Sequence, residues 1–206
     1  SRAMKPMRYV ATRLAQAGFA VAVPDYRLLF RGGRLYEARC DVTDAIHWWQ
    51  TQAPRYGADP ERISLVGLSA GATLMWLSLS ALTRAPSRVV SVFGLYDLTW
   101  LDGGPARWLG DYLLRGHDLA SRQSHSPLSH ASAPSPCLLI HGDRDRLTPI
   151  SQARAMKRLR DRAGLETTLE VVPGARHGFL NDARDPVCEP CIATMLRFLR
   201  GDESAP

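Results

Sequence analysis

The sequence lacks any long apolar run. In its 206 residues no stretch approaches the roughly 20 apolar residues that a membrane-spanning helix needs, and the first residues lack the apolar core of a signal peptide. We therefore expect no membrane span and a cytoplasmic location. The hydrophobic content of 45% over this length predicts one globular domain, residues 1–206, with a substantial core.

Lysine is also scarce. Of the 26 basic residues, only Lys5 and Lys157 are lysines, and the formal net charge is +6. The arginines are scattered along the chain, without a basic run or a basic stripe interleaved with aromatic residues. We read the charge as an arginine-rich surface and expect no nucleic-acid partner.

Cysteine is limited to Cys40, Cys137, Cys188 and Cys191. The spacing of the last two is found in redox pairs and in half zinc sites, and it leaves a local disulfide open. A zinc site would need ligands from Cys40 and Cys137, which fall in a predicted helix and a predicted strand. The chain also has neither Gly-x-Gly-x-x-Gly nor a Walker-type Gly-Lys-Ser/Thr motif. We therefore expect no metal and no cofactor.

Short apolar runs alternate with helical patterns along the chain. The predicted strands are 19–23, 62–66, 89–93, 137–140 and 167–172, and the predicted helices are 6–16, 36–51, 70–82, 150–163 and about 190–199. Short, nearly continuous apolar strands that alternate with amphipathic helices predict an α/β fold, with helices on both faces of a mostly parallel sheet.

One stretch, residues 98–134, interrupts this alternation. It contains Trp100, Trp108 and Tyr112 together with several Gly, Ser and Pro residues. An irregular excursion of this length is more often a lid or a pocket wall than a plain connection. We expect the three aromatic side chains either to line a substrate pocket or to form the core of a small lid.

A Gly-x-Ser-x-Gly motif follows the predicted strand 62–66. The residues are Gly67-Leu68-Ser69-Ala70-Gly71, and a helix-forming run comes directly after them. A strand, a sharp turn and a helix are the context in which this motif carries a nucleophilic serine. The turn holds the serine in a strained backbone conformation, and the small flanking residues let strand and helix pass closely. We therefore expect Ser69 to be a nucleophile, with the backbone N–H of Ala70 as one donor to an oxyanion.

A serine hydroxyl needs a base and an acid that orients the base. In this fold the order along the chain is Ser, then Asp or Glu, then His. Asp145 follows the strand 137–140, and His177 follows the strand 167–172 between two glycines. Both loops lie at the carboxyl ends of strands, the same edge as Ser69, where open α/β sheets place their sites. We expect Ser69, Asp145 and His177 to converge.

Other residues compete for these two roles. The alternative acids are Asp143, which more readily shapes the turn after Gly142, and Asp97, which comes after the strand 89–93. The five other histidines lie on a helix, in the irregular segment or at a strand end: His47, His117, His125, His130 and His141. Only His177 follows the last strand between flexible residues.

The sequence resembles the α/β-hydrolase esterases of the hormone-sensitive-lipase and carboxylesterase type, with arylformamidase-like members. The matching stretches span most of the chain: Pro24-Asp25-Tyr26-Arg27-Leu28, residues 56–63, Gly67-Leu68-Ser69-Ala70-Gly71, Ser126-Pro127-Leu128, residues 141–145 and His177-Gly178-Phe179. The resemblance implies Ser69 as nucleophile, Asp145 as acid and His177 as base. Leu68 stands where many lipase-like members carry Asp or Glu, so the subfamily stays open.

One departure concerns the family's His-Gly-Gly-Gly loop, which supplies most of the oxyanion donors. The chain carries none, and Gly32 and Gly33 follow the strand that such a loop precedes. In the family's sheet, the strand leading into that loop lies between those represented here by 19–23 and 63–66. We therefore expect the chain to be a portion of a longer one; direct pairing of those two strands would contradict this.

The expected activity is hydrolysis of a carboxylic ester of a small acyl group through an acyl-enzyme. An arylformamidase and an esterase acting on acetyl or feruloyl groups of carbohydrates are alternatives with the same mechanism. A different alternative is a non-catalytic hydrolase-fold domain used for binding. The expected partner is a small-molecule ester, and the sequence does not predict an oligomeric state.

Overall fold

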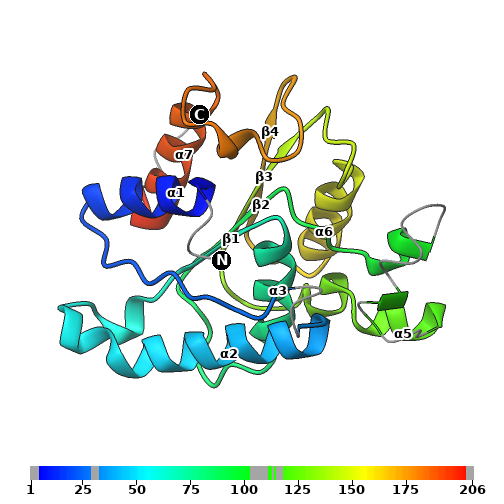
Figure 1. Ribbon diagram of the computed structural model, residues 1–206, viewed down its shortest axis with the longest axis horizontal. Helices are drawn as coiled ribbons and strands as arrows, with labels where there is room; N and C mark the ends of the chain where they lie inside the picture. The colour runs from blue at the N-terminus through cyan, green and yellow to red at the C-terminus, as the bar shows by residue number, and fades with distance from the viewer. Residues whose placement is uncertain (1–4, 29–32, 103–110, 113, 115–117, 203–206) are drawn as a thin grey trace.

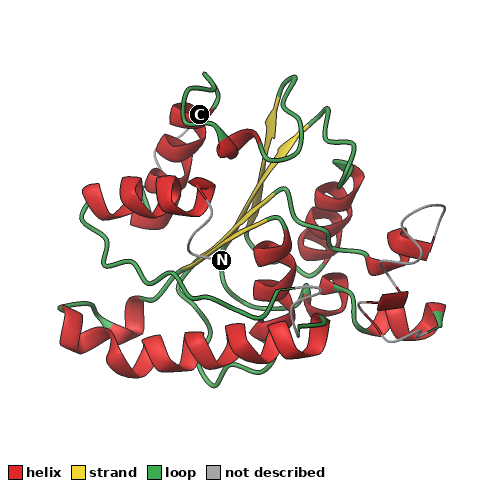
Figure 2. Cartoon of the chain, viewed as in Figure 1, coloured by secondary structure: helices red, strands yellow, loops and turns green. Residues whose placement is uncertain are grey.

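Four parallel strands form the sheet of the computed structural model, which describes residues 5–28, 33–102, 111–112, 114 and 118–202. The strands lie in chain order: β1 (Leu65–Leu68), β2 (Val89–Val92), β3 (Cys137–Gly142) and β4 (Thr167–Val172). Leu65 is aligned with Val89, Val89 with Cys137, and Cys137 with Thr167. All four strands therefore begin level with one another and end at the same edge (Figure 2).

Helices cover both faces of this sheet, as the sequence predicts. Helices α1 (Lys5–Gln16) and α7 (Cys188–Arg200) lie on one side, and α3 (Ala70–Leu79) and α6 (Ser151–Arg162) on the other (Figure 1). Helix α2 (Leu35–Gln52) packs on the outside of α3. The short helices among the described residues are η1 (Ala53–Tyr56), η2 (Pro60–Arg62), η3 (Leu98–Asp102), α5 (Leu119–Ser124), η5 (Pro127–His130) and η6 (Phe179–Asn181).

The two central strands, β2 and β3, bury side chains on both faces, whereas Thr168 and Glu170 of the edge strand β4 are exposed. Val90, Val92 and Ile140 pack with the helices on the α1 and α7 side, whereas Val89 and Leu139 pack with α3 and α6. Because successive side chains of a strand point to opposite faces, a strand buried on both faces must be apolar throughout. This explains why the predicted strands 89–93 and 137–140 agree closely with β2 and β3, whereas β1 begins three residues later than the predicted strand 62–66.

The predicted strand 19–23 is not formed, which corrects the sequence-based interpretation. Phe19 and Val21 pack against the core beside α1, but the segment is extended chain without a strand partner. β1 pairs with β2 alone among the described strands. A parallel strand exists only through hydrogen bonds to a neighbouring strand, and residues 19–23 pair with none of the described strands.

A groove of about 1100 Å³ lies between this extended segment and β1. Its lining includes Phe19, Val21 and Val23 from the segment and Leu65 and Val66 from β1. The edge of β1 that faces away from β2 therefore borders open space. Residues 19–23 and β1 are not paired directly.

The irregular segment partly packs onto the helical layer outside the sheet. Leu98, Leu101 and Leu114 form a buried cluster with side chains of α2 and α3, among them Leu35 and Leu77. In the described part of the chain, no helix has both the length and the apolar character needed to cross a membrane.

Arg160 is a buried arginine that ties α6 to the starts of β3 and β4. Its side chain is fully buried, and its guanidinium donates to the carbonyl oxygens of Ala131, Ala133, Ser135 and Glu166. Since four carbonyl oxygens would lose a charged donor, we expect Arg160→Met to lower the free energy of unfolding by about 3–5 kcal/mol.

Urea denaturation of the purified variant measures this change. Arg158→Met, on the exposed side of the same helix, is the matched control and should stay within about 0.5 kcal/mol of the parent chain. Equal losses in the two variants would contradict the role given to Arg160.

Candidate active site

Ser69 occupies a sharp turn between β1 and α3. Its backbone has φ 51° and ψ −122°, a region that residues with a side chain rarely adopt. The Ser69 N–H donates to the carbonyl oxygen of Val92 on β2 at 2.9 Å, and its carbonyl accepts from Ala72 and Thr73 in the first turn of α3. A conformation of this kind costs on the order of 1–3 kcal/mol and persists only where the surroundings impose it.

The two glycines of the motif differ in what the structure requires of them. A Cβ on Gly67 would lie 2.6 Å from the Cα of Ala72, so only glycine lets β1 and α3 pass this closely. A Cβ on Gly71 would meet no atom within 4 Å. The expectation that both small residues serve the close passage is therefore right for Gly67 and wrong for Gly71, which instead lines the groove beside β1.

The structure brings Ser69, His177 and Asp145 into one chain of contacts. Ser69 Oγ lies 2.9 Å from His177 Nε2, and His177 Nδ1 lies 2.8 Å from Asp145 Oδ2. With its proton on Nδ1, the imidazole donates to the carboxylate and leaves Nε2 free to accept the serine proton. The Asp145 side chain is fully buried, and that of His177 is 19% exposed.

Donors from its own turn hold the Asp145 carboxylate. Oδ1 accepts the backbone N–H groups of Leu147 and Thr148, each at 2.9 Å. Oδ2 accepts the Thr148 hydroxyl at 2.9 Å in addition to His177. A buried carboxylate is tolerated when its oxygens are hydrogen-bonded. Asp145 therefore stays oriented toward His177.

The loop that carries His177 is fixed from the neighbouring strand ends. Gly174 N–H donates to Asp143 Oδ1 at 2.7 Å, so Asp143 shapes the turns, as the sequence predicts. The structure shows no contact between Asp143 and the His177 imidazole. The Phe93 ring packs edge-on against the His177 ring, with centroids 5.0 Å apart.

The other acid and the other described histidines have separate surroundings. Asp97 caps the start of η3 through Thr99. His47 lies on α2, and His125 contacts the carbonyl oxygen of Ser121. Burial lowers the pKa of His130, and His117 falls outside the described residues.

His141 is buried behind the acid. Its Nε2 lies 2.6 Å from the Thr148 carbonyl oxygen and 3.5 Å from Asp145 Oδ2. Burial lowers the pKa of His141 below its usual value. The neutral ring therefore supports the turn that bears Asp145.

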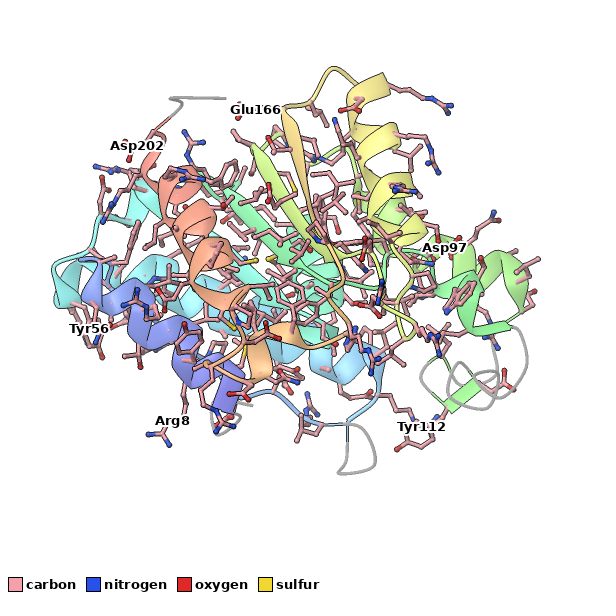
Figure 3. The ribbon with its side chains drawn as sticks, turned by 90° about the horizontal axis from the view of Figure 1, so that it is seen from above. Arg8, Tyr56, Asp97, Tyr112, Glu166 and Asp202 are labelled. Atoms are coloured by element: carbon pink, nitrogen blue, oxygen red, sulfur yellow. The ribbon has the colours of Figure 1, made fainter. Side chains whose placement is uncertain are left out.

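The predicted pocket residues differ in their positions, and only Ala70 lies next to Ser69. Ala70 is exposed at the first position of α3, where a helix leaves N–H groups without an intrahelical acceptor. Trp100 is 48% exposed on η3, and Tyr112 lies at the periphery of the molecule, where Arg34 stacks over its ring (Figure 3). Trp108 falls outside the described residues. The groove that reaches Ser69 is lined by other described residues, including Phe93 and Asn181.

The cysteines form no disulfide. Burial raises the pKa of the Cys188 thiol to about 11 and that of Cys191 to about 12, so these thiols stay protonated and unreactive at neutral pH. Within the described ranges, no group of three or more His, Cys, Asp or Glu side chains could hold a metal ion.

Two residues at the site escaped sequence reasoning. Phe93 has φ 39° although it is bulky, and its ring and carbonyl both face the site. Thr148 contacts Asp145 and His177. The position of Thr148 three residues after Asp145 fits an aspartate turn and is a usable sequence signal, but a strained Phe at a strand end has none.

Together, the parallel sheet and the serine at a strained strand-to-helix turn define an α/β-hydrolase fold. The BD-FAE family model matches residues 1–159. The chain belongs to the BD-FAE family of α/β-hydrolase esterases.

Named relatives agree with this membership. The chain is 30% identical over 216 residues to the esterase LipC of Mycobacterium tuberculosis, with 91% of this chain and 52% of LipC covered. It is 31% identical over 188 residues to ethyl acetate hydrolase of Pseudomonas putida, with 81% and 58% covered. The chain thus spans about half the length of the curated relatives that it matches.

A solved structure supports the fold. The acetyl ester-xyloside bifunctional hydrolase of Caldicellulosiruptor lactoaceticus superimposes with a TM-score of 0.82 at 18% identity, covering 94% of this chain and 75% of that one.

The difference between the two glycines gives a direct test. We expect Gly67→Ala to lower the free energy of unfolding by about 1–3 kcal/mol, because the added methyl group meets backbone that cannot give way. Gly71→Ala should leave stability unchanged or raise it by up to about 1 kcal/mol, since alanine is the better helix former. Thermal unfolding of both variants checks this, and an equal loss in the two would contradict the geometry described for the turn.

Proposed function

We propose that this chain carries the catalytic residues of a serine hydrolase that cleaves carboxylic esters of small acyl groups. The observation that carries the proposal is the contact chain from Ser69 Oγ through His177 to the buried Asp145, with distances of 2.9 and 2.8 Å. Membership in an esterase family supports the reaction class.

The geometry supports a two-step acyl transfer. His177 Nε2 takes the proton of Ser69 as Oγ attacks the ester carbonyl, and the resulting imidazolium donates through Nδ1 to Asp145. His177 then passes the proton to the leaving alcohol, and an acyl-enzyme remains on Ser69. Water, deprotonated by His177, attacks the acyl group, and Ser69 regains its proton as the acid leaves.

The oxyanion formed in each step needs hydrogen-bond donors. The N–H of Ala70 follows Ser69 directly and lies at the start of α3, where the helix dipole favours negative charge. The sequence carries no His-Gly-Gly-Gly motif. Because one missing donor typically costs about 10²–10³ in rate, we expect slow turnover when Ala70 acts alone.

Small acyl esters are the proposed substrates. Support comes from the relative named ethyl acetate hydrolase, which is 31% identical. We expect a p-nitrophenyl ester series from acetyl to octanoyl, an N-formyl aromatic amide and a feruloyl ester to give the highest kcat/KM with acetyl or propionyl. A preference for the formyl amide or the feruloyl ester would instead select one of the alternative activities.

Replacement of the nucleophile tests the proposed chemistry. We expect Ser69→Ala to reduce p-nitrophenyl acetate turnover to background and to abolish labelling by a fluorophosphonate probe, since no other hydroxyl contacts His177 Nε2 in the described chain. Ser80→Ala, at the exposed far end of the same helix, is the matched control and should behave as the parent.

The same experiment separates the enzyme from a binding domain. A hydrolase-fold protein used only for binding would show neither turnover nor labelling in the parent chain. Turnover that persists unchanged in Ser69→Ala would remove Ser69 from its proposed role.

A further inference from the structure

We propose that Thr148 is a positioning residue of the Ser69–His177–Asp145 site, through a hydroxyl that joins the acid and the base and contacts the end of β2. This inference rests on the proposed function. Its basis is a set of three contacts made by one buried oxygen atom, Thr148 Oγ1.

The three contacts join three separate elements of the fold. Thr148 Oγ1 lies 2.9 Å from Asp145 Oδ2, 3.1 Å from His177 Nδ1 and 3.2 Å from the carbonyl oxygen of Phe93. Asp145 belongs to the loop after β3, His177 to the loop after β4, and Phe93 directly follows β2. Thr148 itself is only 7% exposed, so water cannot readily replace these bonds.

The protons can be assigned from the chemistry of the partners. A hydroxyl has one proton to donate and two lone pairs to accept with. Asp145 Oδ2 and the Phe93 carbonyl only accept, so the Thr148 proton goes to one of them, and the carboxylate is both closer and charged. The His177 Nδ1–H then points between Asp145 Oδ2 and Thr148 Oγ1.

This arrangement favours one state of the imidazole. A proton on Nδ1 satisfies two acceptors. Nε2 then carries no proton and can accept from Ser69 Oγ at 2.9 Å. The tautomer and the ring orientation of a catalytic histidine are set by the partner of its other nitrogen. Thr148 shares that function with Asp145 and never touches the reacting atoms.

The strained backbone of Phe93 is a second, independent observation. Phe93 has φ 39°, which is unfavourable for a bulky residue. Its carbonyl faces the Thr148 hydroxyl, and its ring packs against that of His177. Strain of this kind persists where surrounding contacts impose it and clusters at functional sites.

The expected effect is on the rate of chemistry. We expect Thr148→Val, which replaces the hydroxyl by a methyl group of similar size, to lower kcat for p-nitrophenyl acetate about 10- to 100-fold, the range that a hydrogen bond to a charged group is worth. KM should stay within about twofold, because the contacts matter in the transition state more than in substrate binding. Thr148→Ser keeps the hydroxyl and should retain kcat within about threefold.

The controls separate this role from plain stability. Thr43→Val makes the same chemical change on α2, where the hydroxyl bonds only to the Arg39 carbonyl oxygen, and should leave kcat and KM unchanged. If Thr148→Val fails to fold, Thr148→Ser and Thr148→Ala replace it, since these two differ only in the hydroxyl, and the serine variant should be the faster by about tenfold.

The outcomes distinguish this inference from the function on which it rests. Parent-like kcat in Thr148→Val, or Thr148→Ser no faster than Thr148→Ala, overturns the role of Thr148. The proposed function stands in that case, provided that Ser69→Ala is inactive. A rise in KM with kcat unchanged also overturns it. Full activity of Ser69→Ala instead overturns the proposed function.

Discussion

Parallel strands of matched register determine where each side chain of the site stands. β1 to β4 are aligned residue by residue, so the residues that follow the strands emerge side by side at one edge. Ser69, Phe93, Asp143 and the loop of His177 all occupy such positions. The Ser69 N–H bonds to the carbonyl of Val92, and the Phe93 N–H to that of Ile140, so hydrogen bonding of the sheet continues into the site itself. A shift in register would separate the serine from the histidine.

The sequence predicts most of this arrangement because its two central strands, β2 and β3, are buried on both faces. Runs such as Cys137 to Ile140 are apolar at every position, and the structure places strands there. The same signal fails at residues 19–23, since an apolar extended segment becomes a strand only when a neighbour bonds to it, and hydrophobicity carries no information about that neighbour. The convergence of Ser69, Asp145 and His177 follows from their places after three strands. Composition alone suggests Trp100 and Tyr112 as pocket residues, and neither is among the described residues that line the groove at Ser69.

The sequence indicates the role of Thr148 only in part and that of Phe93 not at all. The contacts of Thr148 depend on the fold of a three-residue turn in which Asp145 accepts two backbone N–H groups. That turn can be predicted once Asp145 is identified, but the direction of the Thr148 hydroxyl cannot. The backbone of Phe93 is imposed by neighbours on three elements, and nothing in a Val-Phe-Gly sequence indicates a positive φ. Strain is a property of the assembled structure and not of a local pattern.

The site combines two costs that the fold must offset. A carboxylate with no exposed surface is stable only because four donors reach its two oxygens, and two of these donors come from one residue, Thr148. The left-handed backbone at Ser69 and Phe93 is unfavourable at both positions. The Thr148 hydroxyl donates to Asp145 and lies 3.2 Å from the carbonyl oxygen of Phe93, so the group that satisfies the buried charge also contacts one strained residue. The acid and the base are therefore coupled through a single hydroxyl group that lies beside the strained end of β2, whereas the strain at Ser69 is held separately by Gly67 and the first turn of α3.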